Sequence, residues 1–151
     1  MEDPRPKLQA ALKEAMKSRD NERRDVIRLA QSAIKQVEID SRKDLSAEDV
    51  VAILQKEAKM QRESIAEMRQ AGRDADATQS EKELDILEGF LPQQMSREEI
   101  AALAKQIVDE VGAAAPGDMG KVMGKLMPQV KGRADGNLVN QVVRELLNQA
   151  S

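Results

Sequence analysis

The residues with the greatest capacity for chemistry lie close together near the C-terminus, in residues 118–147. Basic side chains alternate there with glycines, and the set is Lys121, Lys125, Lys131, Arg133, Gly120, Gly124, Gly132 and Gly136. Lys121 and Lys125 are four residues apart, so they share one face of a helix. A glycine inside a helix costs about 1 kcal/mol relative to alanine, which suggests a backbone that another group approaches closely. This combination indicates attraction of an anion through charge and shape.

The composition excludes most other chemistry. The sequence has no His and no Cys, so it offers no imidazole base, no thiolate nucleophile and no ordinary zinc ligands. Adjacent carboxylates such as Asp109 and Glu110 point to different sides of a helix and do not form an acid-base pair. Phe90 is the only aromatic residue, which leaves no platform for stacking bases. We therefore expect no catalytic residue, no metal ion and no cofactor, and we predict that the protein is not an enzyme on its own.

Charge is distributed unevenly along this acidic chain, whose formal net charge is −3. Residues 112–151 carry five Lys and Arg against three Asp and Glu, which makes them the basic part of the sequence. An acidic protein binds polyanions poorly, but a basic C-terminal face could still steer one. No apolar run approaches the roughly 20 residues of a membrane span, and the first residues lack the apolar core of a signal peptide. We expect a cytoplasmic protein without membrane contact.

Two helices must position the basic residues. Apolar residues at helical spacing mark the first helix, namely Met119, Val122, Met123, Leu126 and Met127. Pro128 is expected to end it, and residues 131–136 then form a basic, flexible connection. The apolar stripe of the second helix is Val139, Val142, Val143, Leu146 and Leu147. Asp118 and Asp135 are the expected N-caps, and the whole forms a helical hairpin with a basic corner.

The remaining sequence reads as helical scaffold. Apolar spacing predicts five further helices, over about residues 4–17, 22–39, 47–68, 74–88 and 97–111. No run alternates apolar and polar residues with the period of a strand, so we predict an all-α fold. The segment 92–95 is the best candidate boundary between helical units. The expected domains are therefore residues 1–92, a bundle of about four helices, and residues 93–151, a three-helix unit.

Three segments carry a family resemblance. They are DVIRLAQSAIKQVEID (residues 25–40), ILEGFLPQQMSREEI (residues 86–100) and DMGKVMGKLMPQVKGRADGNLVNQVV (residues 118–143). Through them the chain resembles the GatB/YqeY family, whose small stand-alone members are related to the C-terminal tail of the B-subunit of the tRNA-dependent Asp/Glu amidotransferase. The likeness spans almost the whole chain. The third segment is the most specific, because it joins a glycine-punctuated helix to a KGRA corner and an LVN helix start.

The resemblance implies a relation to transamidation, in which a carbon-nitrogen ligase with glutamine as amido donor makes amidated aminoacyl-tRNA. In the full amidotransferase the tail helps to hold the tRNA body. The residues that the resemblance places against RNA phosphates are Lys121, Lys125, Lys131 and Arg133. The glycines that permit close approach are Gly120, Gly124 and Gly132, while Gly136 and Asn137 shape the start of the second helix.

The match covers a tail and not a catalytic body. In the full enzyme that body binds ATP and the ends of aminoacyl-tRNA, and these 151 residues contain nothing that could replace it. No glycine-rich phosphate loop of the G-x-x-x-x-G-K-[S/T] kind is present. The relation to an amidotransferase therefore describes ancestry and not activity.

Two functions are open at this point. The first is a non-catalytic tRNA-binding accessory module that contacts the tRNA body by shape and charge. The second is a helical protein-interaction module without an RNA ligand, which binds a partner through the long helix 47–68 or through the face of Met119, Met123 and Met127. Under the second function the basic corner is a solvated loop. We expect Gly120 and Gly124 to pack closely against a neighbouring helix, and the three methionines to belong to the core.

Overall fold

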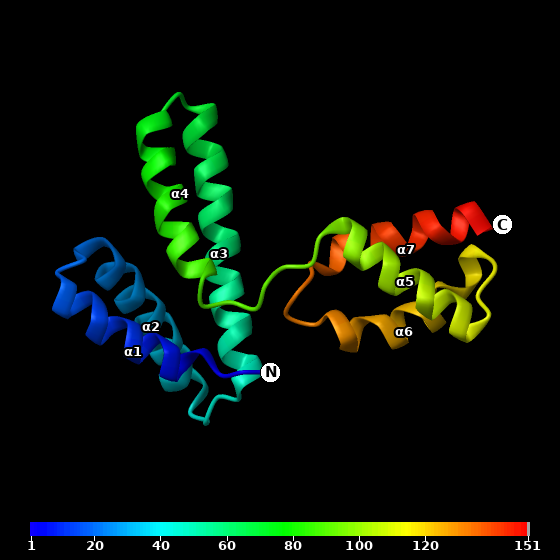
Figure 1. Cartoon of the computed structure of the whole chain (residues 1–151), viewed down its shortest axis with the longest axis horizontal. Coiled ribbons are helices and arrows are strands. Elements are labelled where there is room, and N and C mark those ends of the chain that lie inside the picture. The colour runs from blue at the N-terminus through cyan, green and yellow to red at the C-terminus, as the bar shows by residue number, and fades with distance from the viewer. Residues whose placement is uncertain (151) are drawn as a thin grey trace. The chain divides into compact units, whose positions relative to one another are not determined.

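The fold of this protein is all-α, as predicted. The computed structural model describes residues 1–150, and these contain seven α-helices, one short 3-10 helix and no β-strand. The helices are α1 (Pro4–Ser18), α2 (Asn21–Ser41), α3 (Ala47–Gln70), α4 (Asp74–Glu88), α5 (Arg97–Val111), η1 (Pro116–Asp118), α6 (Met119–Val130) and α7 (Gly136–Ala150) (Figure 1). Within this range no helix combines the length and the apolar character that crossing a membrane requires.

The chain divides into two compact units, each with a core of its own. The N-terminal unit is Met1–Pro92 and contains α1 to α4, and the C-terminal unit is Gln93–Ser151 and contains α5 to α7. An amphipathic helix buries one apolar stripe, so the helices of each unit pack their apolar stripes against one another to form one core.

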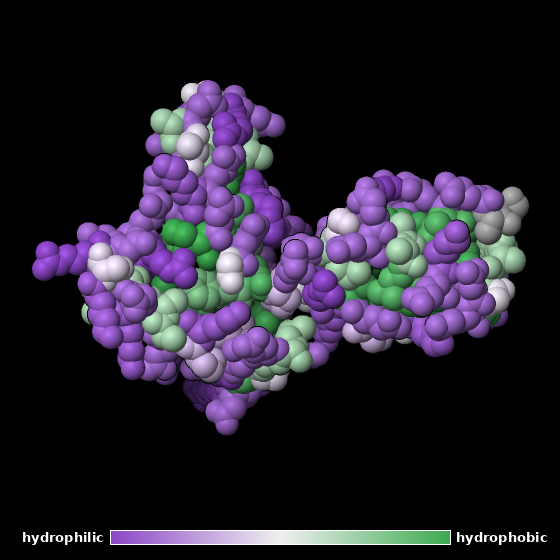
Figure 2. All heavy atoms as spheres, viewed as in Figure 1, coloured by the Kyte–Doolittle hydropathy of each residue, from purple (hydrophilic) through white to green (hydrophobic). Residues whose placement is uncertain are grey.

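The N-terminal unit consists of two helical hairpins, α1–α2 and α3–α4. α3 is the longest helix, and it packs along α4 and also reaches α1 and α2 (Figure 1). The fully buried core side chains of the N-terminal unit come from all four helices and include Leu8, Ile27, Leu54, Ala58 and Ala77. In Figure 2 polar side chains cover most of the visible surface, and apolar side chains show where the two hairpins meet.

Local side-chain chemistry sets where these helices begin and end. The Ser46 hydroxyl accepts a hydrogen bond from the Asp49 N–H at 3.1 Å, and the Asp49 carboxylate accepts one from the Ser46 N–H at 3.0 Å. This capping box satisfies amide groups that the first turn of α3 leaves unpaired. At the other ends of α1 and α2, Arg19 and Arg42 adopt the left-handed conformation with φ of 58° and 53°.

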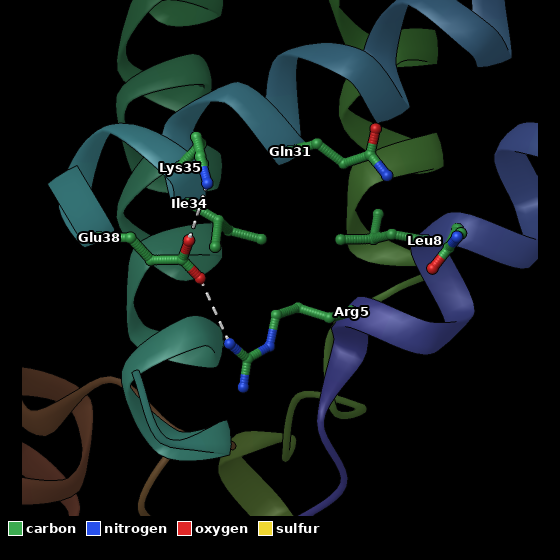
Figure 3. Close-up of a pocket in the computed structure, with 7 residues that line it drawn as sticks. Arg5, Leu8, Gln31, Ile34, Lys35 and Glu38 are labelled. Atoms are coloured by element: carbon green, nitrogen blue, oxygen red, sulfur yellow. Dashed lines mark hydrogen bonds and ion pairs between the residues drawn. The ribbon is translucent and has the colours of Figure 1, made fainter. Parts of the chain in front are cut away.

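An arginine fastens the start of α1 to the rest of the N-terminal unit. The Arg5 guanidinium pairs with Asp3 at 2.7 Å and with Glu38 of α2 at 3.4 Å, and it donates to the Leu45 carbonyl at 2.9 Å (Figure 3 shows the contact with Glu38). The side-chain hydrogen bond from Arg5 holds the pKa of the Asp3 carboxyl below its usual value. One side chain thus joins α1 to α2 and to the loop before α3.

The C-terminal unit closes α5, α6 and α7 around one core, because each of the three packs against the other two. Its fully buried members include Ile100, Val122, Leu126, Val139 and Leu147. A second capping box starts α5, in which the Ser96 hydroxyl accepts from the Glu99 N–H at 3.1 Å and the Glu99 carboxylate accepts from the Ser96 N–H at 2.8 Å.

The prediction that Pro128 ends the first C-terminal helix is wrong. α6 continues to Val130 and contains Pro128 in its last turn. Pro128 has no N–H to donate to the Gly124 carbonyl, so the helix loses one hydrogen bond there. Leu126 and Val130 are both fully buried on the core side of the helix. Their packing holds the last turn in helical form despite the missing bond.

The two cores predict separate effects of core truncation. Leu54→Ala should lower the free energy of unfolding of the N-terminal unit by about 2–5 kcal/mol, because Leu54 is fully buried and leaves a cavity. Leu126→Ala should do the same to the C-terminal unit. Amide hydrogen exchange read helix by helix measures both. The control is Leu29→Ala, whose side chain is 71% exposed and whose loss should cost less than about 0.5 kcal/mol. Equal loss of protection in both units from either core variant would contradict the separation.

Candidate nucleic-acid interface

The face of α6 opposite its buried stripe carries the first two basic candidates. Val122, Leu126 and Val130 point into the core of the C-terminal unit. Lys121 and Lys125 are left in solvent, with side chains that are 70% and 55% exposed. Their spacing of one helical turn places them on one side of the helix, as the sequence predicted.

The glycines of α6 lie beside these lysines, and no other part of the chain packs against them. Gly120 and Gly124 are exposed, and no atom of another part of the protein lies within 4 Å of the position that a Cβ atom would occupy. The expectation that they pack closely against a neighbouring helix is therefore wrong. Larger residues, Val122 and Leu126, make that contact. What α6 presents at its glycines is accessible backbone.

The methionines of α6 face the core and do not form an open groove. Met119, Met123 and Met127 are all partly buried and pack against the hydrophobic core of the C-terminal unit. The Met127 methyl group also lies 3.9 Å from the position that a Cβ atom would occupy on Gly136 at the start of α7. This placement agrees with the interpretation of the methionines as core residues.

The connection between α6 and α7 carries the other two basic candidates, Lys131 and Arg133, both of which are exposed. The sequence predicted a flexible segment, but the structure has a hydrogen-bonded turn. The N–H groups of Arg133 and Ala134 donate to the Val130 carbonyl at 2.9 and 3.1 Å. Gly132, which lies between Lys131 and Arg133, has a φ of 81°, and this explains why a glycine occupies the position.

Long-range hydrogen bonds hold this turn against the start of the unit. The Arg133 side chain donates through Nε to the Gln93 carbonyl at 3.2 Å, and the Arg133 carbonyl accepts from the Met95 N–H at 2.8 Å. Forty residues separate Gln93 from Arg133. Sequence reasoning missed this contact because backbone groups carry no sequence signature. The backbone bond with Met95 fixes the position of the Arg133 backbone, and the bond to Gln93 occupies one donor of the Arg133 guanidinium.

The two predicted N-caps behave differently. The Asp135 carboxylate accepts a hydrogen bond from the Asn137 N–H in the first turn of α7, at 3.3 Å. Asp118 precedes α6 but its side chain makes no capping hydrogen bond to the backbone of that helix, because it closes η1 and turns back to accept from the Ala114 and Ala115 N–H groups at 3.0 and 3.3 Å. The bond from Ala114, followed by that from Ala115, holds the pKa of Asp118 below its usual value.

Acidic side chains lie close to both lysines of α6. The Lys125 ammonium is 3.0 Å from the carboxylate of Glu110 on α5, and the Lys121 ammonium is 3.9 Å from that of Asp118. Exposed pairs of this kind are worth about 0–1 kcal/mol, so a stronger anion can displace the carboxylate. Glu110 was not expected at this site, since it lies fifteen residues from Lys125 in the sequence.

Among residues 1–150, no three carboxylates gather closely enough to bind a metal ion. What the arrangement can do is attract an anion with lysines at the start and middle of α6 and with Lys131 and Arg133 after its end.

The sequence matches the Yqey-like protein family over residues 5–147. The protein belongs to that family. The predicted resemblance to the GatB/YqeY family is thereby confirmed. A relative from Pyrenophora tritici-repentis is 30% identical over 150 residues, which cover 94% of this chain and 80% of the relative. Its name is "Altered inheritance of mitochondria protein 41, mitochondrial", which states no catalytic activity.

A shorter likeness connects this Yqey-like protein to an amidotransferase. Over 50 residues it is 38% identical to the E-subunit of the Glutamyl-tRNA(Gln) amidotransferase of Thermococcus sibiricus. The match covers 33% of this chain but only 8% of that much longer protein. The relation is therefore to a small part of the amidotransferase chain.

Gly132 gives a direct test of the turn that carries Lys131 and Arg133. Gly132→Ala should lower the free energy of unfolding of the C-terminal unit by about 1–2 kcal/mol, because a Cβ atom is strained at a φ of 81°. Gly117→Ala is the control, since Gly117 has open space around it and no positive φ. Thermal unfolding followed by circular dichroism compares the two. Equal stability of both variants would show that the turn does not require glycine.

Proposed function

We propose that this protein is a non-catalytic accessory module that binds the body of tRNA through its C-terminal unit. The observation that carries the proposal is the outer face of α6, which combines the exposed Lys121 and Lys125 with the open backbone of Gly120 and Gly124. The likeness to part of an amidotransferase chain whose name includes glutamyl-tRNA(Gln) supports tRNA as the ligand. The relation to glutamine-dependent amidation is one of ancestry.

The shape of this face suits a phosphate backbone. Lys121 stands in the first turn of α6 and Lys131 follows its last residue, so about 15 Å of helix axis separates them. That length allows contact with more than one phosphate. Between them the glycines let a phosphate approach the helix without meeting a side chain. RNA helices are recognised largely by shape and by phosphate contacts, and these need no aromatic platform.

The local arrangement of charged residues on the C-terminal unit supports the proposal, whereas the net charge of that unit does not. Residues 93–151 carry seven Lys and Arg and seven Asp and Glu, so the C-terminal unit has no formal net charge. Its basic surface arises because lysines gather on α6 and carboxylates on α5. Glu110 partly offsets Lys125, and phosphate must compete with it. Binding should therefore be modest in affinity and steeply dependent on salt.

Removing the basic candidates tests the role of charge. Lys121→Ala, Lys131→Ala and Arg133→Ala together should weaken tRNA binding and lower the slope of log affinity against log salt by about one for each phosphate that the variant no longer binds. Gel shifts at salt concentrations between about 50 and 200 mM measure both quantities.

The matched control changes the same net charge elsewhere. It replaces three exposed lysines of α1 that are not seen in an ion pair, namely Lys7, Lys13 and Lys17. That variant should keep the wild-type salt slope. The proposal fails if the α6 variant binds tRNA with wild-type affinity and slope, or if both triple variants weaken binding equally.

Filling the glycine positions tests close approach separately from charge. Gly120→Gln with Gly124→Gln should leave α6 folded and even stabilise it, because glutamine is a better helix former than glycine and open space surrounds both positions. The tRNA affinity should nevertheless fall about tenfold, which corresponds to about 1.4 kcal/mol. Ala102→Gln on the exposed side of α5 is the control. Unchanged tRNA affinity in the double variant would contradict close approach at α6.

Protein interaction is the second candidate function, and the N-terminal unit favours it. Large apolar side chains stand in solvent there, among them Met16, Leu29, Ile39 and Met60. The two surfaces that the sequence suggested are less suitable. α3 buries its apolar stripe in the core of its own unit, and the methionines of α6 pack inward. Failure to bind tRNA at low salt would favour this second function.

A further inference from the structure

A small depression opens in the N-terminal unit where α2, α3 and α4 meet. Its volume is about 90 Å³. Ala30 and Leu87 are buried at its floor, and Val26 is partly buried beside them. Leu29 lines the α2 side with a side chain that is 71% exposed. The space is too small for a typical organic ligand, whose sites measure about 300–1,000 Å³, but it can take several methylene groups of one side chain.

Two glutamates line this apolar floor, Glu57 from α3 and Glu83 from α4, and both are half-buried. The Glu57 carboxylate accepts no hydrogen bond and forms no ion pair with the described residues of the chain. Glu83 receives one long hydrogen bond, at 3.5 Å, from a Gln79 amide that is 2.7 Å from Glu22. The depression therefore carries two carboxylates and, among its described lining residues, no cation.

The nearby polar groups are already committed elsewhere. Gln61, which also lines the depression, donates its amide to the Ser80 carbonyl at 3.0 Å. Arg62 pairs with Glu88 at 3.2 Å. Arg23 lies over the Phe90 ring, with its guanidinium carbon 5.4 Å from the ring centre. None of these groups neutralises Glu57.

A larger depression of about 210 Å³ between α1 and α2 shows the contrast (Figure 3). Its carboxylate, Glu38, faces Arg5 at 3.4 Å and Lys35 at 3.8 Å, so the chain supplies the cations itself. A half-buried carboxylate without such a partner loses hydration and gains nothing in return. At Glu57 and Glu83 no described lining residue supplies such a cation.

We propose that the depression between α2, α3 and α4 binds a lysine or arginine side chain from a basic, amphipathic segment of a partner protein. The aliphatic stem of that side chain packs on Ala30 and Leu87, and its charged end lies between Glu57 and Glu83. Leu29 covers an apolar residue of the same segment. The charge complementarity argues for this occupant and against RNA, since carboxylates repel phosphate. The site is independent of the surface of α6.

A model peptide tests the proposal on the full chain. The probe is a helical peptide of about 14 residues, or roughly four turns, with leucines at helical spacing and lysines elsewhere, and glutamates replace the lysines in a matched peptide. Isothermal calorimetry should detect binding of the lysine peptide and none of the glutamate peptide. Glu57→Gln with Glu83→Gln should weaken binding at least tenfold, and Leu29→Ala at least threefold. Amide NMR shifts in the wild type should concentrate in α2, α3 and α4.

The control removes the same charge from a different surface. Glu14→Gln with Glu63→Gln changes two exposed carboxylates that are not seen in an ion pair, and it should alter affinity less than twofold. Equal weakening by both pairs of substitutions would mean general attraction to an acidic protein and would overturn the site. So would failure of the wild type to bind. A wild-type dimer in light scattering that Glu57→Gln with Glu83→Gln converts to a monomer would make a second copy the occupant and overturn the proposed partner.

Discussion

The burial of one stripe of α6 is the constraint on which the proposed binding surface depends. Val122, Leu126 and Val130 have no contact with water, and a helix that points these residues inward must turn Gly120, Lys121, Gly124 and Lys125 outward. No interaction at the surface itself is needed to place them. The same packing keeps α6 helical through Pro128, and so sets where Lys131 begins the turn. The packing of the core therefore determines which charged side chains α6 exposes.

Periodicity and capping predicted the helices well because both are local. The range 74–88 follows from its leucine stripe, and the start of α3 follows from the reciprocal bonds of Ser46 and Asp49. The errors came from effects that spacing does not contain. Packing against α5 and α7 outweighed the local cost of Pro128, and η1 redirected the Asp118 carboxylate toward the preceding loop. Contacts between Lys125 and Glu110, or Arg133 and Gln93, depend on which helices become neighbours.

The glycines of α6 show how one observation can support opposite expectations. Helical glycines are costly, so the sequence justified the inference that something approaches them. Within the chain nothing does, because Gly120 and Gly124 face open space. No contact among the described residues accounts for this cost, and the proposed function accounts for it by a ligand that approaches the glycines. In the N-terminal unit the Glu57 carboxylate has no partner among the described residues, and the same argument there points to a cationic ligand. The two proposals thus place an anionic partner on the C-terminal unit and a cationic one on the N-terminal unit.

The ends of α1 and α2 have a consequence for how far the stability of this protein could rise. Arg19 and Arg42 occupy the left-handed region, where a residue with a Cβ atom carries a strain of about 1 kcal/mol that glycine avoids. Every arginine codon becomes a glycine codon through a single nucleotide change. A more stable chain therefore lies one mutational step away at two positions.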